Sequence, residues 1–241
     1  MKINKTIMGL FLLMVFSGIG RVSYASSCDS MSCGGYNIPF NVKTIISEGY
    51  EKIYISSYGN KKYLTLTTNH DVNQCSVLFL IENERISSTP AIGRGRSLCN
   101  VSVHDDKVVS SWRDQGKWNN DIYHINSSGG WVLLFSDSCI GCSQTKRTFF
   151  FNEKETDTIL LSDGDDFTKR LPLEGQVSVE RADLFKNADI DMKTKACLIK
   201  GDHVELLDMS ENGDFYKIKY KTSTGKIIIY WIQSEDLSVS L

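Results

Sequence analysis

Apolar and polar residues alternate with a period of two along most of the chain, in short runs rich in β-branched and aromatic residues. This alternation is typical of strands that bury one face, and the three-to-four-residue spacing of amphipathic helices is nearly absent. Turn-forming Gly, Asn and Asp residues separate the runs, so the pattern predicts an all-β protein. The strands expected to pair as hairpins are 52–55 with 63–67, 101–103 with 108–112, and 121–125 with 131–135, and further strands are expected at 148–151 and 158–161.

The first part of the mature chain, residues 26–172, is expected to form a β-sandwich-like or meander domain. Run 77–81 is apolar throughout and predicts a buried strand. A closed β-propeller is excluded because each blade needs about 40–45 residues and a ring needs at least four blades, which is more than residues 26–172 can supply. Pro172 and Gly175 interrupt the strand pattern, which predicts a boundary there and a second domain over 173–241.

The second domain contains a recognisable order of strands and turns over residues 195–207, 213–220, 225–226, 230–232 and 235–237. Over about residues 177–238 this order resembles the bacterial SH3 domain family, and no family is identified for the first domain. The resemblance implies a small β-barrel that serves as a cell-wall or protein-contact module, binding or bracing without catalysis. Tyr230 stands where such modules often have Gly, and the motif with which eukaryotic relatives grip proline-rich peptides is absent.

Residues 1–25 have the organisation of an export signal, with Lys2 and Lys5 before an apolar stretch and small residues up to Ala25. The stretch is shorter than the ~20 residues that span a bilayer, which predicts cleavage after Ala25 and a periplasmic protein. Loss of Lys2, Lys5 and Arg21 reduces 27 basic residues to 24, against 29 acidic residues, for a formal charge of −5. This mild acidity argues against nucleic acid and against anionic lipid as partners.

All seven cysteines lie after the predicted cleavage site, and disulfides are their default use in an oxidising compartment. Sequence leaves the connectivity open. Local spacing suggests Cys28–Cys33, Cys75–Cys99 and Cys139–Cys142. Cys197 would then be unpaired, on a strand, as a small buried hydrophobe.

Catalytic and metal sites are not expected. Cys139 and Cys142 have the spacing of thiol-disulfide oxidoreductases, but the residues after them predict a strand instead of the helix that lowers the pKa of the attacking thiol. Cys33, in a segment rich in Gly and Ser, lacks the helix and His that a cysteine nucleophile needs. The four histidines are isolated from metal-ligand partners, at positions 70, 104, 124 and 203. The sequence therefore predicts no enzyme, no cofactor and no metal.

A contact surface remains as the candidate functional site. Trp112, Arg113 and Trp118 fall in a segment, 112–120, expected to be a polar connection, and Trp and Arg often anchor protein interfaces. Packing of both tryptophans against the core is the alternative. In the second domain, Tyr216, Tyr220 and Tyr230 are expected to contribute to an aromatic groove.

These observations predict an exported, non-catalytic binding protein of the inhibitor or immunity type. Its partner would be an envelope-active toxin or hydrolase, which it would bind and neutralise. The alternatives are a peptidoglycan- or envelope-associated scaffold and a thiol-disulfide oxidoreductase that uses Cys139 and Cys142.

Overall fold

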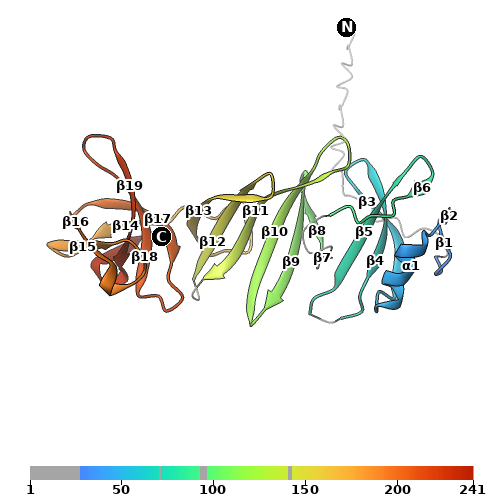
Figure 1. Ribbon diagram of the computed structural model, residues 1–241, viewed down its shortest axis with the longest axis horizontal. Helices are drawn as coiled ribbons and strands as arrows, with labels where there is room; N and C mark the ends of the chain where they lie inside the picture. The colour runs from blue at the N-terminus through green and yellow to red at the C-terminus, as the bar shows by residue number, and fades with distance from the viewer. Residues whose placement is uncertain (1–27, 71, 93–96, 141–142, 241) are drawn as a thin grey trace, which may run out of the picture.

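The computed structural model describes residues 28–70, 72–92, 97–140 and 143–240. The predicted signal, residues 1–25, lies outside them. The molecule is all-β apart from one short α-helix, and its three main sheets follow one another along the long axis (Figure 1). An N-terminal sheet lies at one end, a meander at the centre and a strongly curled sheet at the other end. The predicted fold class is confirmed, with the meander form of the first region.

The N-terminal sheet is built on four consecutive strands, β3 (Lys52–Tyr58), β4 (Lys61–Thr67), β5 (Cys75–Glu82) and β6 (Arg85–Ile86). β7 (Leu98–Cys99) pairs with the start of β5. A small hairpin of β1 (Ser32–Cys33) and β2 (Tyr36–Asn37) precedes them. The predicted hairpin around Gly59 and the buried strand at β5 are confirmed.

The helix α1 (Phe40–Ser47) was not predicted from the sequence. It has eight residues, too few to establish a helical period, and Val42, Thr44, Ile45 and Ile46 are β-branched. The helix forms because Val42 is fully buried with Ile38 in the core beside β4 and β5. Tertiary packing outweighs local propensity here.

The central sheet is a six-stranded antiparallel meander in sequence order: β8 (Ser102–His104), β9 (Lys107–Asp114), β10 (Lys117–Ile125), β11 (Trp131–Ile140), β12 (Gln144–Phe151) and β13 (Lys154–Ser162). The prediction of a polar connection over 112–120 is wrong, because β9 and β10 extend through it. Only Gln115 and Gly116 form the turn, with φ of 47° and 83°. Two positive φ values are what a two-residue hairpin turn requires, and Gly116 adopts its value without strain.

The C-terminal sheet has seven strands in the order β16-β15-β19-β18-β17-β14-β20 and curls into a half-barrel. They are β14 (Glu174–Val177), β15 (Arg181–Phe185), β16 (Lys193–Ile199), β17 (His203–Met209), β18 (Phe215–Lys221), β19 (Ile227–Gln233) and β20 (Leu237–Ser240). The predicted first strand of this domain is divided into β14 and β15, and β20 was missed. The predicted helical turn is present as η2 (Ser234–Asp236).

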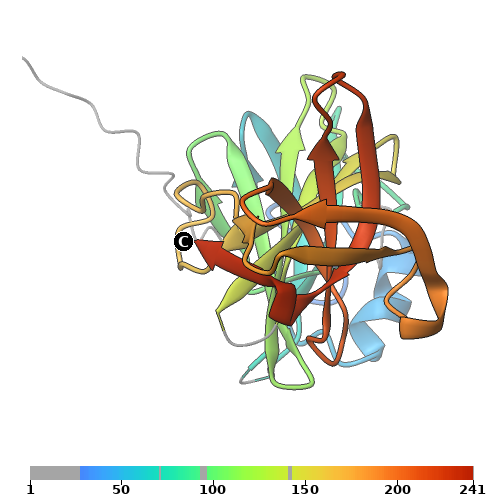
Figure 2. The same cartoon turned by 90° about the vertical axis from the view of Figure 1, so that its left-hand side faces the viewer.

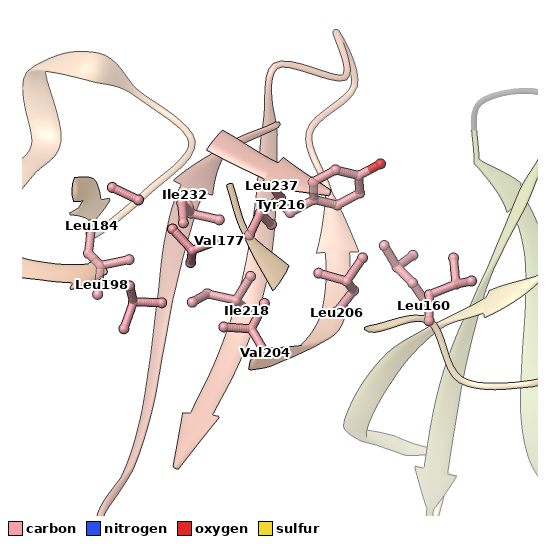
Figure 3. Packing of buried hydrophobic residues seen from close by; sticks show 12 residues of the cluster. Leu160, Val177, Leu184, Leu198, Val204, Leu206, Tyr216, Ile218, Ile232 and Leu237 are labelled. Carbon is pink, nitrogen blue, oxygen red and sulfur yellow. The ribbon is translucent and has the colours of Figure 1, made fainter. Parts of the chain in front are cut away.

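The concave side of the curl encloses the largest apolar core (Figure 3). Leu184, Leu206, Ile218 and Ile232 are fully buried there. Leu160 of β13 belongs to the same cluster, so the central sheet contributes to this core. At the other end of the central sheet, Tyr123 of β10 packs into a cluster with residues of the N-terminal sheet.

Two of the three suggested disulfides are present, Cys28–Cys33 and Cys75–Cys99. The third cannot be assessed because Cys142 lies outside the described residues. Cys197 forms no disulfide among the described cysteines and is partly buried on β16. Two disulfides agree with export to an oxidising compartment. Within the described ranges, no helix is long and apolar enough to cross a membrane.

Candidate binding groove

One face of the central sheet carries a continuous row of polar side chains. Strand pairing aligns Asp121 of β10 with Ser110 of β9 and with Ser136 of β11. Thr148 of β12 and Thr158 of β13 continue the alignment. Because side chains at paired positions share a face, four hydroxyl groups and one carboxylate cross five strands in this polar row.

A second row lies beside the polar row, two residues further toward the β9–β10 turn. It contains Trp112, Asn119, Ser138, Lys146 and Leu160, aligned across the same five strands. The row starts with an aromatic ring and ends with an apolar residue buried in the C-terminal core. The row therefore has an apolar residue at each end and three polar residues, Asn119, Ser138 and Lys146, between them.

Two adjoining hollows follow these rows, and together they form what we call the central groove. The first has a volume of about 460 Å³, and Ser110, Trp112, Asp121, Ser136 and Phe150 are among the residues that line it. The second has a volume of about 510 Å³ and extends to Asp208 and Trp231 of the curled sheet. Asn119 and Ser138 line both, so the two hollows are parts of one open groove.

Hydrogen bonds fix the centre of the groove. The Ser136 hydroxyl donates to the Asp121 carboxylate, and the Tyr123 hydroxyl donates to the same carboxylate at 3.2 Å. Ser110 is buried, and its hydroxyl accepts the Cys99 N–H at 2.9 Å. The Cys75–Cys99 disulfide is thereby joined to the groove wall. These side chains are positioned by strands and by one another before any partner binds.

The curled sheet is held at the far end of the groove by polar contacts. Lys146 Nζ lies 2.6 Å from the Asp208 carboxylate, and Gln144 Nε2 donates to the Tyr216 hydroxyl at 2.9 Å. Strands β13 and β17 lie against each other, as the view of Leu160 and Leu206 in Figure 3 also shows. These contacts set the position of Trp231 relative to the central sheet.

The opposite face of the central sheet contains a buried ionic cluster that sequence reasoning missed. Asp137 is 2% exposed, and Arg147 donates to both of its carboxylate oxygens at 2.7 Å. Arg170 forms a second ion pair with Asp137. The two guanidinium groups also donate to the carbonyls of Phe167 and Gly164, which holds loop 163–172 against the sheet. Asp137 lies between Ser136 and Ser138, and Arg147 lies between Lys146 and Thr148, so their surroundings in the sequence resemble those of solvent-exposed residues.

The first three predicted contact residues do not form one surface. Trp112 lines the central groove and is partly buried, whereas Arg113 and Trp118 are a cross-strand pair on the opposite face. The Arg113 guanidinium carbon lies 6.0 Å from the centre of the Trp118 ring, which is 49% exposed. The alternative of two tryptophans capping one core is therefore wrong as well.

The three predicted tyrosines belong to the packed interior of the curled sheet. Tyr216 is buried at the junction with β12, and Tyr220 and Tyr230 pack against the core cluster. Tyr220 donates to Asp202 at 3.1 Å, and partial burial together with this carboxylate raises the Tyr220 pKa. The expected aromatic groove is not present at these positions. Whether any of the six residues contacts a partner stays a prediction.

The histidines do not assemble a metal site. His104 lies 3.5 Å from Asp105 and 3.9 Å from Asp166, and His124 lies 3.7 Å from Asp106. A hydrogen bond from the Thr168 hydroxyl, followed by Lys169, lowers the pKa of Asp166. Within the part of the chain that the structure describes, no three His, Cys, Asp or Glu residues are grouped to hold a metal ion.

The cysteine sites lack the geometry of thiol catalysis in the described ranges. Cys33 is disulfide-bonded and fully buried. Cys139 lies within strand β11, near its end, and not at the start of a helix. The helix dipole that would stabilise a thiolate is absent at Cys139.

In comparisons with known proteins, no family model, no curated protein and no solved structure matches the chain.

Proposed function

We propose that the protein is an exported, non-catalytic binding protein of the inhibitor or immunity type. In this proposal it neutralises an envelope-active toxin or hydrolase by binding a segment of that protein in the central groove. The observation that carries the proposal is the open groove itself, built on rigid strands and bounded by two packed neighbouring sheets. A surface fixed in advance loses little conformational entropy on binding, which favours tight inhibition.

The groove chemistry favours a partner segment that carries a lysine or arginine. Asp121 is at the centre of the polar row, and Glu155 lines the same hollow. Trp112 and Phe150 provide aromatic rings on which a cationic side chain can also pack. Rings together with opposite charge are common anchors of protein interfaces.

Size and compartment agree with this proposal. A stable interface buries about 800 Å² on each partner. The two hollows, of about 460 and about 510 Å³, adjoin each other along one face of the central sheet and leave room for an extended partner segment. Two disulfides suit a protein that works outside the cytoplasm. The resemblance of residues 177–238 to bacterial SH3 domains supports a binding or bracing module at one end of the groove.

The test measures inhibition of cell-wall hydrolysis. Envelope extract from the source cells is incubated with dye-labelled insoluble peptidoglycan, with and without the purified protein. We expect wild-type protein to slow dye release stoichiometrically. Asp121→Lys should abolish this effect, and Arg113→Glu on the opposite face should leave it unchanged. Equal inhibition by wild type and Asp121→Lys would refute the groove as the contact, and no inhibition by wild type would refute the proposal for hydrolases.

The polar row favours one second candidate, an envelope-associated scaffold that binds peptidoglycan. Hydroxyl, amide and carboxylate groups beside an aromatic ring can form hydrogen bonds with a polyhydroxylated chain. Co-sedimentation with insoluble peptidoglycan distinguishes the candidates: the scaffold pellets and loses binding on Asp121→Lys, whereas the inhibitor stays in the supernatant. The oxidoreductase alternative has no supporting geometry at Cys139, and Cys142 lies outside the described residues.

A further inference from the structure

Loop 163–172 and the face of the central sheet opposite the central groove enclose a third hollow, which we call the crevice. The loop connects β13 with β14, so it lies at the junction of the central and curled sheets, which stand one behind the other in Figure 2. Strands β9 to β12 form one side of the crevice, and Asp163, Gly164, Asp165 and Arg170 of the loop form the other. Its volume of about 440 Å³ is within the ~300–1,000 Å³ of small-molecule sites.

The loop is fixed against the sheet before any ligand binds. Arg147, on β12, donates to the Phe167 carbonyl at 2.9 Å. Arg170 donates from its Nε to the Gly164 carbonyl, also at 2.9 Å, which ties the two ends of the loop together. A site whose walls are already in place loses little conformational entropy when it binds a ligand.

Two deeply buried side chains of the crevice have polar groups that the protein does not use. Thr145 is only 4% exposed, and its hydroxyl forms no hydrogen bond with the residues that the structure describes. The Arg170 side chain is only 7% exposed, and its Nε and Nη1 bond to Gly164 and Asp137, whereas its Nη2 has no partner in the described ranges. Because both residues line the crevice and are covered elsewhere, a molecule in the crevice is what these groups can bond to.

The crevice offers hydrogen-bond donors and acceptors together. The Ser111 hydroxyl donates to Asn120 Oδ1 at 2.7 Å, which leaves the amide nitrogen of Asn120 available as a donor. Asp163 and Asp165 are exposed and contribute carboxylate acceptors. The Thr145 hydroxyl can act in both ways. A ligand rich in hydroxyl groups matches this mixture, because every hydroxyl is also both a donor and an acceptor.

Trp118 adds an aromatic surface to these polar groups. Its ring lines the crevice and is half-exposed. The Arg113 guanidinium carbon lies 6.0 Å from the ring centre, and Arg113 Nε donates to the Gly116 carbonyl at 3.4 Å, so the ring has a fixed neighbour. A sugar ring has the complementary surface, with apolar C–H bonds on its faces and hydroxyl groups around its rim. Burial of the C–H face against Trp118 is favourable, and the rim stays available for the polar groups.

Charge selects a neutral ligand. The crevice and the ion pairs in its floor contain three carboxylates and three cationic side chains. They are Asp137, Asp163, Asp165, Lys117, Arg147 and Arg170. These charges cancel, so the crevice exerts no net attraction on a strongly acidic or strongly basic molecule.

We propose that the crevice binds a neutral saccharide, with one sugar ring stacked on Trp118 and its hydroxyl groups bonded to Thr145 and Arg170. The site lies on the face opposite the central groove and is independent of the proposed function. Peptidoglycan carries carboxylates, so the ligand class also differs from that of the scaffold candidate. Since the crevice is open to water on one side, we expect a dissociation constant of about 0.1 to 1 mM.

The test is a titration of the full exported protein, labelled with ¹⁵N, followed by two-dimensional ¹H–¹⁵N nuclear magnetic resonance. The probes are maltotetraose, cellotetraose and mannotetraose. Each of the four tryptophans gives one indole N–H signal, which reports where a probe binds. With at least one probe, the Trp118 signal should shift and saturate, and the Trp112 signal of the central groove should stay in place.

Variants then test the two kinds of contact, with affinity measured from the amide signals of loop 163–172. Trp118→Ala should weaken binding about tenfold through loss of the stacking surface. Thr145→Val should weaken it at least about threefold, because one hydrogen bond to the ligand is lost while none within the protein is broken. Thr145→Ser, which keeps the hydroxyl, should bind as wild type does. Phe40→Ala, at an exposed aromatic residue on α1, is the matched control and should also leave binding unchanged.

Four results would overturn the proposal. The first is no shift of the Trp118 signal with any of the three probes at about 20 mM, well above the expected dissociation constant. The second is unchanged affinity of both Trp118→Ala and Thr145→Val. The third is a shift of Trp112 in place of Trp118, which would put the saccharide in the central groove. The last is tighter binding of tetragalacturonate or tetralysine than of the neutral probes, since a charged ligand would then be preferred.

Discussion

The central meander and the curled C-terminal sheet are assembled from the same unit, a short antiparallel hairpin, yet they enclose their interiors differently. The curled sheet closes over Leu184, Leu206 and Ile218, so one of its faces is sealed from water by apolar packing. The meander does not close. One face is covered by loop 163–172 through a buried ionic cluster, and the other is left open as the central groove.

This difference explains why the candidate binding surface is on the meander. A closed half-barrel uses its concave face for its own stability, and only its rim and edges remain available. An open sheet needs other sources of rigidity, and here its two neighbours and the Asp137 cluster provide them. Two regions of similar sequence pattern therefore differ in that the curled sheet buries one face in an apolar core and the meander leaves one face open.

The largest expected effect tests whether the meander depends on buried charge. Asp137→Ala leaves Arg147 and Arg170 without their carboxylate partner in a buried site, which should lower the free energy of unfolding by about 4 kcal/mol. Urea denaturation followed by tryptophan fluorescence measures the change. Asp208→Ala, which removes a more exposed ion pair, should cost about 1 kcal/mol or less. Equal losses for the two variants would contradict the importance of the cluster.

A second pair of variants compares the sealed face of the curled sheet with the open face of the meander. Leu206 is fully buried, and Leu206→Ala should lower the free energy of unfolding by about 3 kcal/mol through lost packing and the cavity left behind. Thr148→Ala in the polar row should change it by no more than about 0.5 kcal/mol. The same denaturation measurement applies to both. A costly Thr148→Ala would mean that the polar row holds the meander together and is not kept for binding.

A third measurement asks how strongly the two regions are joined. A double-mutant cycle with Lys146→Ala and Asp208→Ala should give a coupling energy of about 0.5 kcal/mol, since the pair is partly exposed. The control is a second cycle with Lys62→Ala and Asp208→Ala. Lys62 is on β4 of the N-terminal sheet, so this cycle should give no coupling energy. A Lys146–Asp208 coupling near zero would leave apolar packing around Leu160 as the main connection between the regions.

The smallest effect concerns loop 163–172 and pH. Hydrogen bonds from Thr168 and the charge of Lys169 lower the pKa of Asp166 below its ordinary value of 3.8. A lowered folded-state pKa means that Asp166 stabilises the fold fully above about pH 4, and that this contribution is lost as pH falls toward the folded-state pKa. Melting temperatures should therefore fall more steeply with acid in wild type than in Asp166→Asn. Parallel curves would show that Asp166 does not help to hold the loop.

Sequence alone determined the strand content and most hairpins, because period-two alternation and turn residues act locally. The pairs β3–β4 and β10–β11 and the helical turn η2 were expected at nearly their observed positions. Local spacing also suggested the Cys28–Cys33 and Cys75–Cys99 disulfides. The helix α1 escaped prediction because its stability comes from contacts with distant strands.

The candidate site was decided by tertiary structure. Ser110, Asp121, Ser136 and Thr148 are unremarkable in the sequence, and only strand register aligns them in one row. Register likewise separated Trp112 from Trp118, which the sequence had placed in one loop. Asp137 and Arg170 are 33 positions apart and meet only when loop 163–172 folds onto the sheet. The alternation of apolar and polar residues shows that a strand has two different faces. Which of these faces is covered depends on chain segments that are distant in the sequence.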